Sequence, residues 1–263
     1  MRPKIVVIKY GGAAMQTPAL IQTTLQDVVR LKRLGIQPVL VHGGGPEISK
    51  MCQQMGIVPA FVNGLRVTDR ETLEIAQMVL VGKINKELVS LLNQEEGRAV
   101  GLSGQDANLI LAKQADKNLG FVGEIEQVNP EILILLIEAG FIPVIAPMAT
   151  SKRSQSYNIN ADSAASEIGA ALQADSLILL TDVEGVLKDP KDPSTKIDII
   201  KTSEWGAVVE SGSLKGGMIP KIEGALAAIQ RGVNQVHILD GRVPNVLLLH
   251  FQDRETKGTS IYV

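Results

Sequence analysis

Lysines stand beside pairs of glycines near both ends of this 263-residue sequence. Residues 9–12 read Lys-Tyr-Gly-Gly after an apolar run, and residues 215–221 read Lys-Gly-Gly-Met-Ile-Pro-Lys before a helical pattern. An ammonium group beside bare backbone amides suits a phosphate, because both neutralise its charge. Lys9 and Lys221 are therefore candidates to flank a transferred phosphoryl group, and Asp162 is the candidate to hold both ammonium groups. A surface lysine beside a turn is the alternative at either position.

A run of three glycines follows the second apolar strand candidate. Residues 42–46 read His-Gly-Gly-Gly-Pro, and a proline at the first helical position predicts a strand, a turn and then a helix. The amides that begin such a helix favour an anion in the turn. The run is not a Walker A motif, because no Gly-Lys-Ser/Thr follows, and not a GxGxxG motif, because position 48 is Ile. A purely structural tight turn is the alternative.

Two further segments offer polar side chains for an acceptor molecule. An Asn-Gly pair signals a hairpin turn, and Arg66 shortly after it could clamp a carboxylate through two parallel hydrogen bonds. An exposed hairpin arginine is the alternative. Alternation places Asn158 and Asn160 on one side of an extended segment, with Asp162 entering an alanine-rich helix. One of these three suffices as the helix cap, so the others are available for binding, unless their role is capping alone.

Short β-branched runs alternate with longer helical patterns along the chain. Strands are predicted over residues 4–9, 37–42, 98–102, 141–146, 176–181 and 235–239. Helices are predicted over 18–34, from 68 through 81, from 129 to 140, from 160 or 162 to 172 and over 217–230, and a small antiparallel sheet over 108–128. This alternation indicates an α/β fold, a three-layer sandwich around an open, mainly parallel sheet. Ligands of open sheets bind where strands end, so the polar loop over residues 180–186 is a candidate binding loop, with a generic loop between strand and helix as the equal alternative.

Composition excludes several classes of protein. Lys and Arg number 26 against 28 Asp and Glu, for a net charge of −2, and aromatic residues are only 3%. Nucleic-acid binding is therefore disfavoured, because it needs a basic surface and, for single strands, stacking platforms. Cys52 is the one cysteine and the three histidines lack metal-ligand spacing, so we predict neither a disulfide nor a metal ligand. No apolar run approaches the ~18 residues that span a bilayer and no signal-peptide core is present, so we predict a cytoplasmic protein without membrane partners.

Motifs that occur in a fixed order along the chain resemble those of the amino acid kinase family. They are KYGGAAM (9–15), VHGGGPEI (41–48), NGLRVTD (63–69), GLSGQD (101–106), LGFVGEI (119–125), NINAD (158–162), LLTDVEGV (179–186) and GGMIPKI (216–222). The resemblance runs through the whole chain, and the motifs are jointly very specific. It implies one α/β domain over residues 1–263, in which a lobe at 1–174 binds an acyl amino acid and a lobe at 175–263 binds ATP.

The resemblance also implies a reaction, in which the γ-phosphoryl group of MgATP moves to the side-chain carboxylate of N-acetyl-L-glutamate, the second step of arginine synthesis. The two transition-state lysines of the family fall on Lys9 and Lys221, and its lysine-organising aspartate falls on Asp162. Its acceptor site falls on Gly44, Gly45, Arg66, Asn158 and Asn160. Its nucleotide site falls on Gly11, Gly12, Thr181, Asp182, Val183, Gly185, Val186, Leu187, Ser213, Leu214, Lys215, Gly217 and Met218. Mg²⁺ is expected chiefly on phosphate oxygens, so no protein ligand is named.

Two departures from the arginine-inhibited branch of the family concern regulation. Only three residues precede the first strand, where that branch carries a helix that builds a hexamer and helps to form the inhibitor site. Residues 250–259 also depart from the branch's C-terminal pattern by one glutamate and one glycine. We therefore expect a homodimer without strong arginine feedback. The nearest alternatives are a sister kinase for a carrier-linked aminoadipate or aspartate-type acceptor, and a catalytically silent sensor, although a sensor would not need both lysines.

Overall fold

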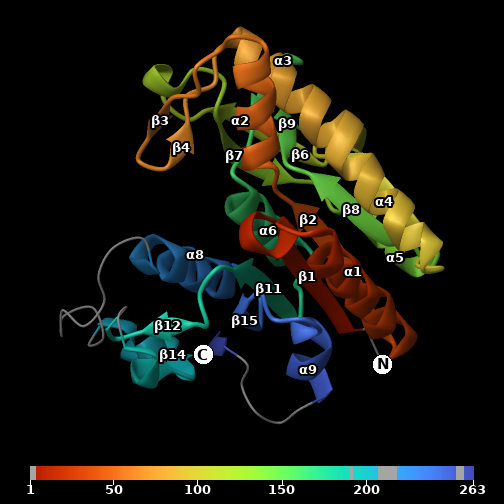
Figure 1. Cartoon of the computed structure of the whole chain (residues 1–263), viewed down its shortest axis with the longest axis vertical. Helices are drawn as coiled ribbons and strands as arrows, with labels where there is room; N and C mark the ends of the chain where they lie inside the picture. The colour runs from red at the N-terminus through yellow and green to blue at the C-terminus, as the bar shows by residue number, and fades with distance from the viewer. Residues whose placement is uncertain (1–3, 190–191, 207–217, 253–257) are drawn as a thin grey trace. The chain divides into compact units, whose positions relative to one another are not determined.

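The structure, a computed structural model, describes residues 4–189, 192–206, 218–252 and 258–263 (Figure 1). The chain forms two compact units. Unit 1 consists of Met1–Pro38 and Gly169–Val263, and unit 2 consists of Val39–Ile168. The lobes predicted from the sequence, 1–174 and 175–263, divide the chain by the ligand that each lobe is expected to bind. This assignment of ligands to lobes stays a prediction.

Unit 1 is built on strands in the order β14-β16-β15-β11-β1. Their bounds are β1 Lys4–Tyr10, β11 Ser176–Thr181, β14 Ile199–Lys201, β15 Gln235–Asp240 and β16 Gly258–Tyr262. β1, β11 and β15 run parallel, whereas β16 is antiparallel to β15. All six residues of β11 are buried, as its unbroken apolar run predicted. The register pairs Lys9 with Leu179 and Thr181 with Asp240, so the carboxyl ends of the three parallel strands meet at one edge.

Helices pack against this sheet within unit 1. They are α1 Pro18–Arg33, α8 Met218–Gln230 and the short α9 Val246–Gln252, and 3-10 turns cover Gly12–Met15, Pro193–Thr195 and Thr202–Glu204. α1 begins where the sequence predicted, because Thr17 caps it by accepting from the Leu20 amide at 3.2 Å and Pro18 follows as the first helical residue. Asp27 of α1 accepts from the Leu248 amide at 3.3 Å, which ties α1 to α9. A two-stranded ribbon, β12 Val186–Leu187 with β13 Lys196–Ile197, lies beyond β11 in the chain.

Unit 2 contains three parallel strands in the order β2-β8-β5 and a separate four-stranded sheet in the order β10-β9-β6-β7. The bounds are β2 Ile36–His42, β5 Ala99–Ser103, β6 Ile110–Gln114, β7 Gly123–Val128, β8 Ile142–Ala146, β9 Met148–Thr150 and β10 Ser156–Asn158. β6 and β7 pair antiparallel, which confirms the small antiparallel sheet predicted in this part of the chain. A hairpin of β3 Phe61–Val62 and β4 Leu65–Arg66 turns through a left-handed Asn63-Gly64 pair, as that dipeptide predicted.

A long helical segment of unit 2 differs from the prediction (Figure 1). It consists of α3 Arg70–Gln77, a π-helix η2 Met78–Ile84 and α4 Asn85–Gln94, so it continues thirteen residues beyond the predicted end at Val81. Its cap is Asp69, which accepts from the Thr72 amide at 2.8 Å, so the helix begins at Arg70 rather than at the predicted residue 68. The remaining helices are α2 Gly45–Gln54, α5 Glu131–Glu138 and α6 Ala161–Ala171, with 3-10 turns at Asp106–Asn108 and Lys117–Leu119.

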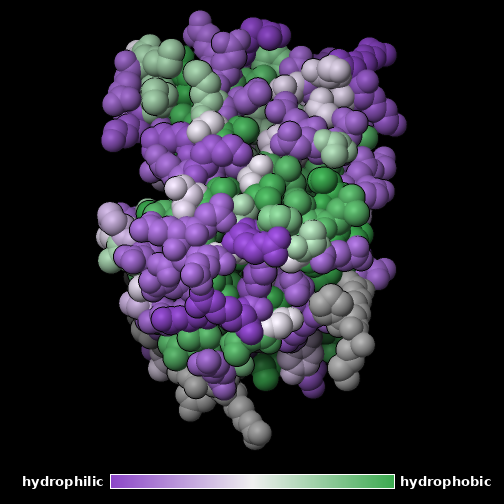
Figure 2. All heavy atoms as spheres, turned by 90° about the vertical axis from the view of Figure 1, so that its right-hand side faces the viewer, coloured by the Kyte–Doolittle hydropathy of each residue, from purple (hydrophilic) through white to green (hydrophobic). Residues whose placement is uncertain are grey.

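The core is aliphatic, as the scarcity of aromatic residues predicted. The largest fully buried side chains are Tyr10 and a set of leucines and isoleucines. Polar side chains cover much of the face shown in Figure 2, and apolar patches interrupt them. Several large apolar side chains of unit 2 are exposed, among them Met78, Leu91, Ile134 and Leu135. Within the described residues, no helix is long and apolar enough to cross a membrane.

Candidate active site

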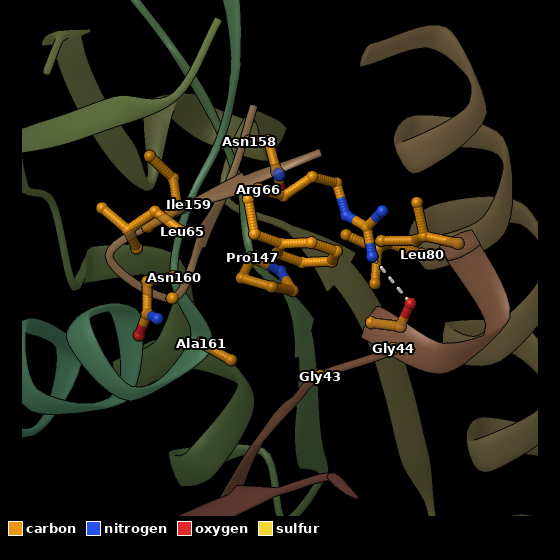
Figure 3. A pocket seen from close by; sticks show the side chains of 14 residues that line it. Gly43, Gly44, Leu65, Arg66, Leu80, Pro147, Asn158, Ile159, Asn160 and Ala161 are labelled. Atoms are coloured by element: carbon orange, nitrogen blue, oxygen red, sulfur yellow. Dashed lines mark hydrogen bonds between the residues drawn. The ribbon is translucent and has the colours of Figure 1, made fainter. Parts of the chain in front are cut away.

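Unit 2 contains a cavity of about 200 Å³, shown in Figure 3. It lies where the turn after β2, the β3–β4 hairpin, the π-helix and the start of α6 come together. Its lining residues are Gly43, Gly44, Gly45, Ile48, Phe61, Gly64, Leu65, Arg66, Leu80, Pro147, Asn158, Ile159, Asn160 and Ala161. All five residues predicted to bind the acceptor are among them, so the structure brings these residues together in one pocket.

The triple-glycine run forms the turn between β2 and α2, as predicted, and α2 begins at Gly45 with a proline in its first turn. A side chain at Gly44 would crowd the ends of two apolar side chains. A Cβ there would lie 2.8 Å from Leu80 Cδ2 and closer still to Ile84 Cδ1. No side chain therefore screens this turn, and the amino end of α2 carries the partial positive charge that favours an anion.

Arg66 is buried in the pocket, with 8% of its surface exposed, so the alternative of an exposed hairpin arginine is wrong. Its Nη2 donates to the Gly45 carbonyl and to Ser49 Oγ, both at 2.8 Å. Its guanidinium lies 4.8 Å from the centre of the Phe61 ring. Its Nη1 is buried without a hydrogen-bond partner among the described residues, and burial lowers the pKa of the guanidinium from its ordinary value. A buried cation with an unused donor is suited to an anionic ligand, because the ligand would supply the missing charge and acceptor.

The polar residues before and at the start of α6 make different contacts. Asn160 Oδ1 accepts from the backbone amides of Asp162 at 2.8 Å and Ser163 at 3.1 Å, so Asn160 is the cap that the sequence left open among three candidates. Asn158 ends β10, and its Nδ2 donates to Thr68 Oγ1 at 3.3 Å. Asp162 lies in the first turn of α6. A binding role for the amide of Asn160, beside its capping role, stays a prediction.

Apolar side chains complete the pocket. Phe61, Leu65, Leu80, Pro147 and Ile159 line it together with the polar groups. None of the lining residues is aspartate or glutamate. A cavity with one buried cation, bare backbone amides, two amide side chains and apolar walls suits a small carboxylate that carries an apolar group.

A second set of predicted residues lies at the sheet edge of unit 1. Lys9 is the penultimate residue of β1, and Gly11 and Gly12 follow it, Gly12 with a left-handed φ of 60° that favours glycine. The parallel register places Lys9 opposite Leu179, two residues before the loop 181–187 begins. An ammonium group, a glycine turn and that loop therefore share the carboxyl edge of this sheet, where ligands of open α/β sheets bind.

The loop 181–187 is held by residues that sequence reasoning missed. Thr259 Oγ1 accepts from the Val186 amide at 2.7 Å and donates to the Ile197 carbonyl at 2.6 Å. Gly185 has a φ of 140°, and a Cβ there would lie 2.8 Å from the same Thr259 oxygen. Because 73 residues separate Val186 from Thr259, only the tertiary fold could reveal this contact.

The turn after β15 is closed by a bidentate ion pair that the sequence analysis also missed. Arg242 donates from Nε and Nη2 to the two carboxylate oxygens of Asp240, at 2.9 and 2.8 Å. The Gly241 amide donates to the Thr181 carbonyl at 2.8 Å, which joins this turn to the start of the 181–187 loop. In the sequence, the available signal for this ion pair is an acidic and a basic residue on either side of one glycine.

The remaining predicted residues are placed as follows. Lys221 lies in the first turn of α8 and is half-buried. Ser213, Leu214, Lys215 and Gly217 lie outside the described residues, and Met218 begins α8. Lys9 and Lys221 belong to unit 1 and Asp162 to unit 2. Among the described residues, no three His, Cys, Asp or Glu side chains group so that they could hold a metal ion.

The fold, with helices around a mostly parallel sheet, is that of a family of kinases. The chain belongs to the amino acid kinase family, whose model matches residues 4–240. Its α/β fold with a mostly parallel sheet and its dependence on ATP follow from that membership.

Two curated relatives are similar to this chain over nearly its whole length. The chain is similar to the acetylglutamate kinase of Desulfitobacterium hafniense, with 54% identity over 258 residues that cover 94% of this chain and 87% of that enzyme. The acetylglutamate kinase of Desulforamulus reducens is 50% identical over 262 residues, covering 98% of this chain and 91% of its own length. Among solved structures, N-acetylglutamate synthase from Neisseria gonorrhoeae, complexed with coenzyme A and N-acetyl-glutamate, has a TM-score of 0.86 and 25% identity. That similarity covers 100% of this chain and 60% of the synthase chain.

Proposed function

We propose that this kinase transfers the γ-phosphoryl group of MgATP to the side-chain carboxylate of N-acetyl-L-glutamate and forms N-acetyl-L-glutamyl 5-phosphate, the second step of arginine synthesis. The names of the relatives support this substrate. The observation that carries the proposal is the unused Nη1 donor of buried Arg66 in a pocket with apolar walls. A carboxylate oxygen of the acceptor satisfies that donor.

The lining of the pocket also supports an acceptor whose amino group is acetylated. A free α-amino acid carries an ammonium group, and burying it requires a carboxylate partner. The lining residues include no aspartate or glutamate, whereas Leu65, Leu80 and Ile159 offer apolar surface. Acetylation removes the charge and adds an apolar methyl group, so the pocket favours the acylated amino acid over free glutamate or aspartate. Asn158 and Asn160 are proposed to hydrogen-bond the polar atoms of this acceptor.

The chemistry is proposed to depend on positioning and on neutralising charge. Lys9 and Lys221 offset the negative charge on the transferred group, and Asp162 orients their ammonium groups. The amides of Gly44 and Gly45 are proposed to bind the acceptor. Gly11, Gly12 and the loop 181–187 are proposed to hold the nucleotide, with residues 213–218. Mg²⁺ would neutralise phosphate charge and would be held by the phosphate oxygens.

The test is ADP release from MgATP with a panel of acceptors: N-acetyl-L-glutamate, L-glutamate, L-aspartate and N-acetyl-aminoadipate. Turnover selective for N-acetyl-L-glutamate supports the proposal. Turnover that prefers free glutamate or aspartate contradicts the argument from the missing carboxylate. ATP binding without turnover on any acceptor favours a carrier-linked acceptor or a silent sensor instead.

The proposal extends to a cytoplasmic homodimer without strong feedback by arginine. Exposed apolar side chains of unit 2, such as Leu135 and Met78, support self-association. The departures of residues 250–259 from the arginine-inhibited pattern support the lack of feedback. Light scattering at micromolar concentration and an arginine titration of the kinase assay test the two statements separately.

A further inference from the structure

We propose that His42 and Asn85 are positioning residues that fix the peptide between Gly43 and Gly44 and so aim the Gly44 amide for binding. This inference rests on the proposed function, because the turn they fix lines the proposed acceptor pocket. Neither residue lines the pocket itself. Both act through the backbone of the glycine turn.

Both side chains are fully buried, with 0% of their surface exposed. His42 ends β2, and its Nδ1 lies 2.9 Å from the Gly43 carbonyl. Its Nε2 lies 3.3 Å from Asn85 Nδ2. A chain of two contacts thus leads from the start of α4 to the glycine turn.

The contacts of His42 and Asn85 together decide which nitrogen of the imidazole carries the proton. Asn85 Nδ2 lies 2.9 Å from the Val144 carbonyl and 3.3 Å from the Leu102 carbonyl, so this amide atom must be the donor nitrogen rather than the oxygen. The Gly43 carbonyl can only accept, so His42 Nδ1, 2.9 Å from it, carries the proton and donates. The unprotonated Nε2 then accepts from Asn85 Nδ2, whose two hydrogens are shared among Nε2 and the two carbonyls. Burial lowers the pKa of His42 to about 4, so the imidazole is neutral at pH 7 and can serve both contacts.

Geometry then links the Gly43 carbonyl to the next amide. In a trans peptide the carbonyl of one residue and the N–H of the next point in opposite directions. Holding the Gly43 carbonyl on the imidazole therefore holds the Gly44 N–H on the opposite side. Two adjacent glycines without Cβ atoms let such a peptide rotate easily, so the turn needs an external restraint to keep one orientation.

The helical segment that carries Asn85 restrains the turn at a second point. Leu80 and Ile84 of the π-helix occupy the space where a Cβ of Gly44 would lie. Asn85 follows directly as the first residue of α4, and its Oδ1 occupies the space of a Cβ at Gly101. One helical segment, widened by its π-helix, thus contacts Gly44 directly through Leu80 and Ile84. It contacts Gly43 indirectly, through Asn85 and His42. π-helical turns frequently occur at functional sites.

Two substitutions of His42 test its contact with the Gly43 carbonyl and its contact with Asn85 separately. In His42→Asn the amide nitrogen occupies the place of Nδ1, so the donor to the Gly43 carbonyl is retained. In His42→Gln the amide group occupies the place of Nε2, so the contact with Asn85 is retained and that donor is lost. We expect the KM for N-acetyl-L-glutamate to rise about tenfold in His42→Gln and only about threefold in His42→Asn, with the KM for MgATP changed less than about twofold in both.

Asn85→Ala has a matched control on the same helix. Asn93 also bonds strand backbone, with Nδ2 donating to the Ala99 carbonyl at 3.2 Å and Oδ1 accepting from the Ala99 amide at 2.6 Å. Both alanine variants should lower the melting temperature. Only Asn85→Ala should raise the acceptor KM, because only Asn85 reaches the turn. Equal effects of the two variants on that KM would overturn the proposal, as would equal effects of the two His42 variants.

A spectroscopic readout keeps the proposal testable even if the proposed function fails. The ¹⁵N–¹H signals of Gly43, Gly44 and Gly45 report the orientation of the turn without any turnover. We expect those signals to move or broaden in His42→Gln and Asn85→Ala and to stay near the wild-type positions in Asn93→Ala. If the wild-type protein phosphorylates no acceptor but the variants show this pattern of signals, the proposed function is wrong and the positioning role stands. Unchanged glycine signals in His42→Gln contradict the positioning role.

Discussion

Arg66 Nη2 donates a 2.8 Å hydrogen bond to the backbone carbonyl of Gly45, which stands 21 residues earlier in the chain. One guanidinium therefore holds the first residue of α2 with one nitrogen and presents the other, Nη1, without a partner. The planar fork of arginine makes this division possible, because its donors point in fixed and different directions. The residue that is proposed to bind the acceptor is thus also the residue that sets the position of the helix start.

Arg66→Lys tests this division. A lysine keeps the charge but has one ammonium group, which cannot reach the Gly45 carbonyl, Ser49 and a ligand together. We expect the KM for N-acetyl-L-glutamate to rise about 10- to 100-fold, the worth of a charge-assisted hydrogen bond, with the KM for MgATP nearly unchanged. Arg70→Lys is the control, because Arg70 is exposed and also lies over an aromatic ring, Phe121, at 5.2 Å. An Arg66→Lys enzyme with a wild-type acceptor KM would show that Nη1 binds no acceptor.

Gly44→Ala tests the packing behind the turn. The added Cβ meets Leu80 Cδ2 at 2.8 Å and lies closer to Ile84 Cδ1, so these side chains or the turn must move. Overpacking of this kind costs about 1–3 kcal/mol, which lowers the melting temperature by several degrees. We also expect weaker acceptor binding, because the displaced groups line the pocket.

Ile84→Val removes the nearest clashing atom and so should recover part of the lost stability in the double variant. Gly82→Ala is the control, since Gly82 lies in the same π-helix and has no heavy atom within 4 Å of an added Cβ. It should be neutral or stabilising, as alanine is the better helix former. Gly44→Ala with an unchanged melting temperature would mean that the turn tolerates a side chain.

Stability should fall in mild acid because of two histidines in unit 1, of which His237 is buried and His250 is half-buried. The rings of His237 and His250 lie 4.2 Å apart, and His237 Nδ1 lies 2.8 Å from Ser260 Oγ. Burial lowers the pKa of His237 to about 3 and that of His250 to about 4, from an ordinary 6.5. Below pH 6.5 the unfolded chain binds protons that the folded chain does not, so the free energy of unfolding decreases as pH falls towards 4.

Urea unfolding at pH 7.5, 6.5, 5.5 and 5.0 measures this dependence. Each of these histidines contributes a slope of about 1.4 kcal/mol per pH unit once the unfolded residue is protonated. His250→Phe removes one titrating group and should lower the slope by about that amount. A variant slope equal to that of the wild type would mean that His250 is protonated in the folded protein over this pH range.

The sequence was sufficient for the elements that have a strong local signal. β11 begins and ends where its apolar run does, and α1 begins at its threonine cap and proline. The helix after Asp69 was predicted to end at Val81, directly before Gly82, whereas it continues to Gln94. In the fold that glycine lies inside a π-helix whose apolar residues are held by the pocket and the core. Tertiary packing overrode local propensity there.

The candidate site was predictable in residue type but not in environment. Hairpin position alone favoured an exposed Arg66, and only the packing of α2 and Phe61 around it shows that the guanidinium is buried. Asn158, Asn160 and Asp162 are equal candidates for a cap in the sequence, and the backbone path selects Asn160. Contacts between residues far apart in the chain, such as His42 with Asn85, leave no local pattern at all.

Lys221→Ala tests the proposed catalytic lysine of α8. Removing one preorganised donor to the transferred group typically costs about 10²–10³ in kcat, and nucleotide binding should survive because the lysine is proposed to act on the transferred group. Single-turnover phosphorylation and calorimetric ATP binding measure the two effects separately. Lys201→Ala is the control, because Lys201 is an exposed residue of β14 that lies 3.8 Å from Glu204. A Lys221→Ala enzyme with most of its kcat intact would exclude the proposed role.

Thr259→Val tests whether the contact between β16 and the loop 181–187 matters for the nucleotide. Valine has nearly the same shape as threonine, but it leaves the Val186 amide and the Ile197 carbonyl without the hydroxyl that pairs with both. Each buried group left unpaired costs about 1–3 kcal/mol, and the loop should relax to find new partners. We expect the KM for MgATP to rise at least about fivefold while the acceptor KM changes little, because the acceptor pocket is built from other residues. Thr259→Ser retains the hydroxyl and should restore nucleotide affinity, so equal KM values for the two variants would contradict a bracing role.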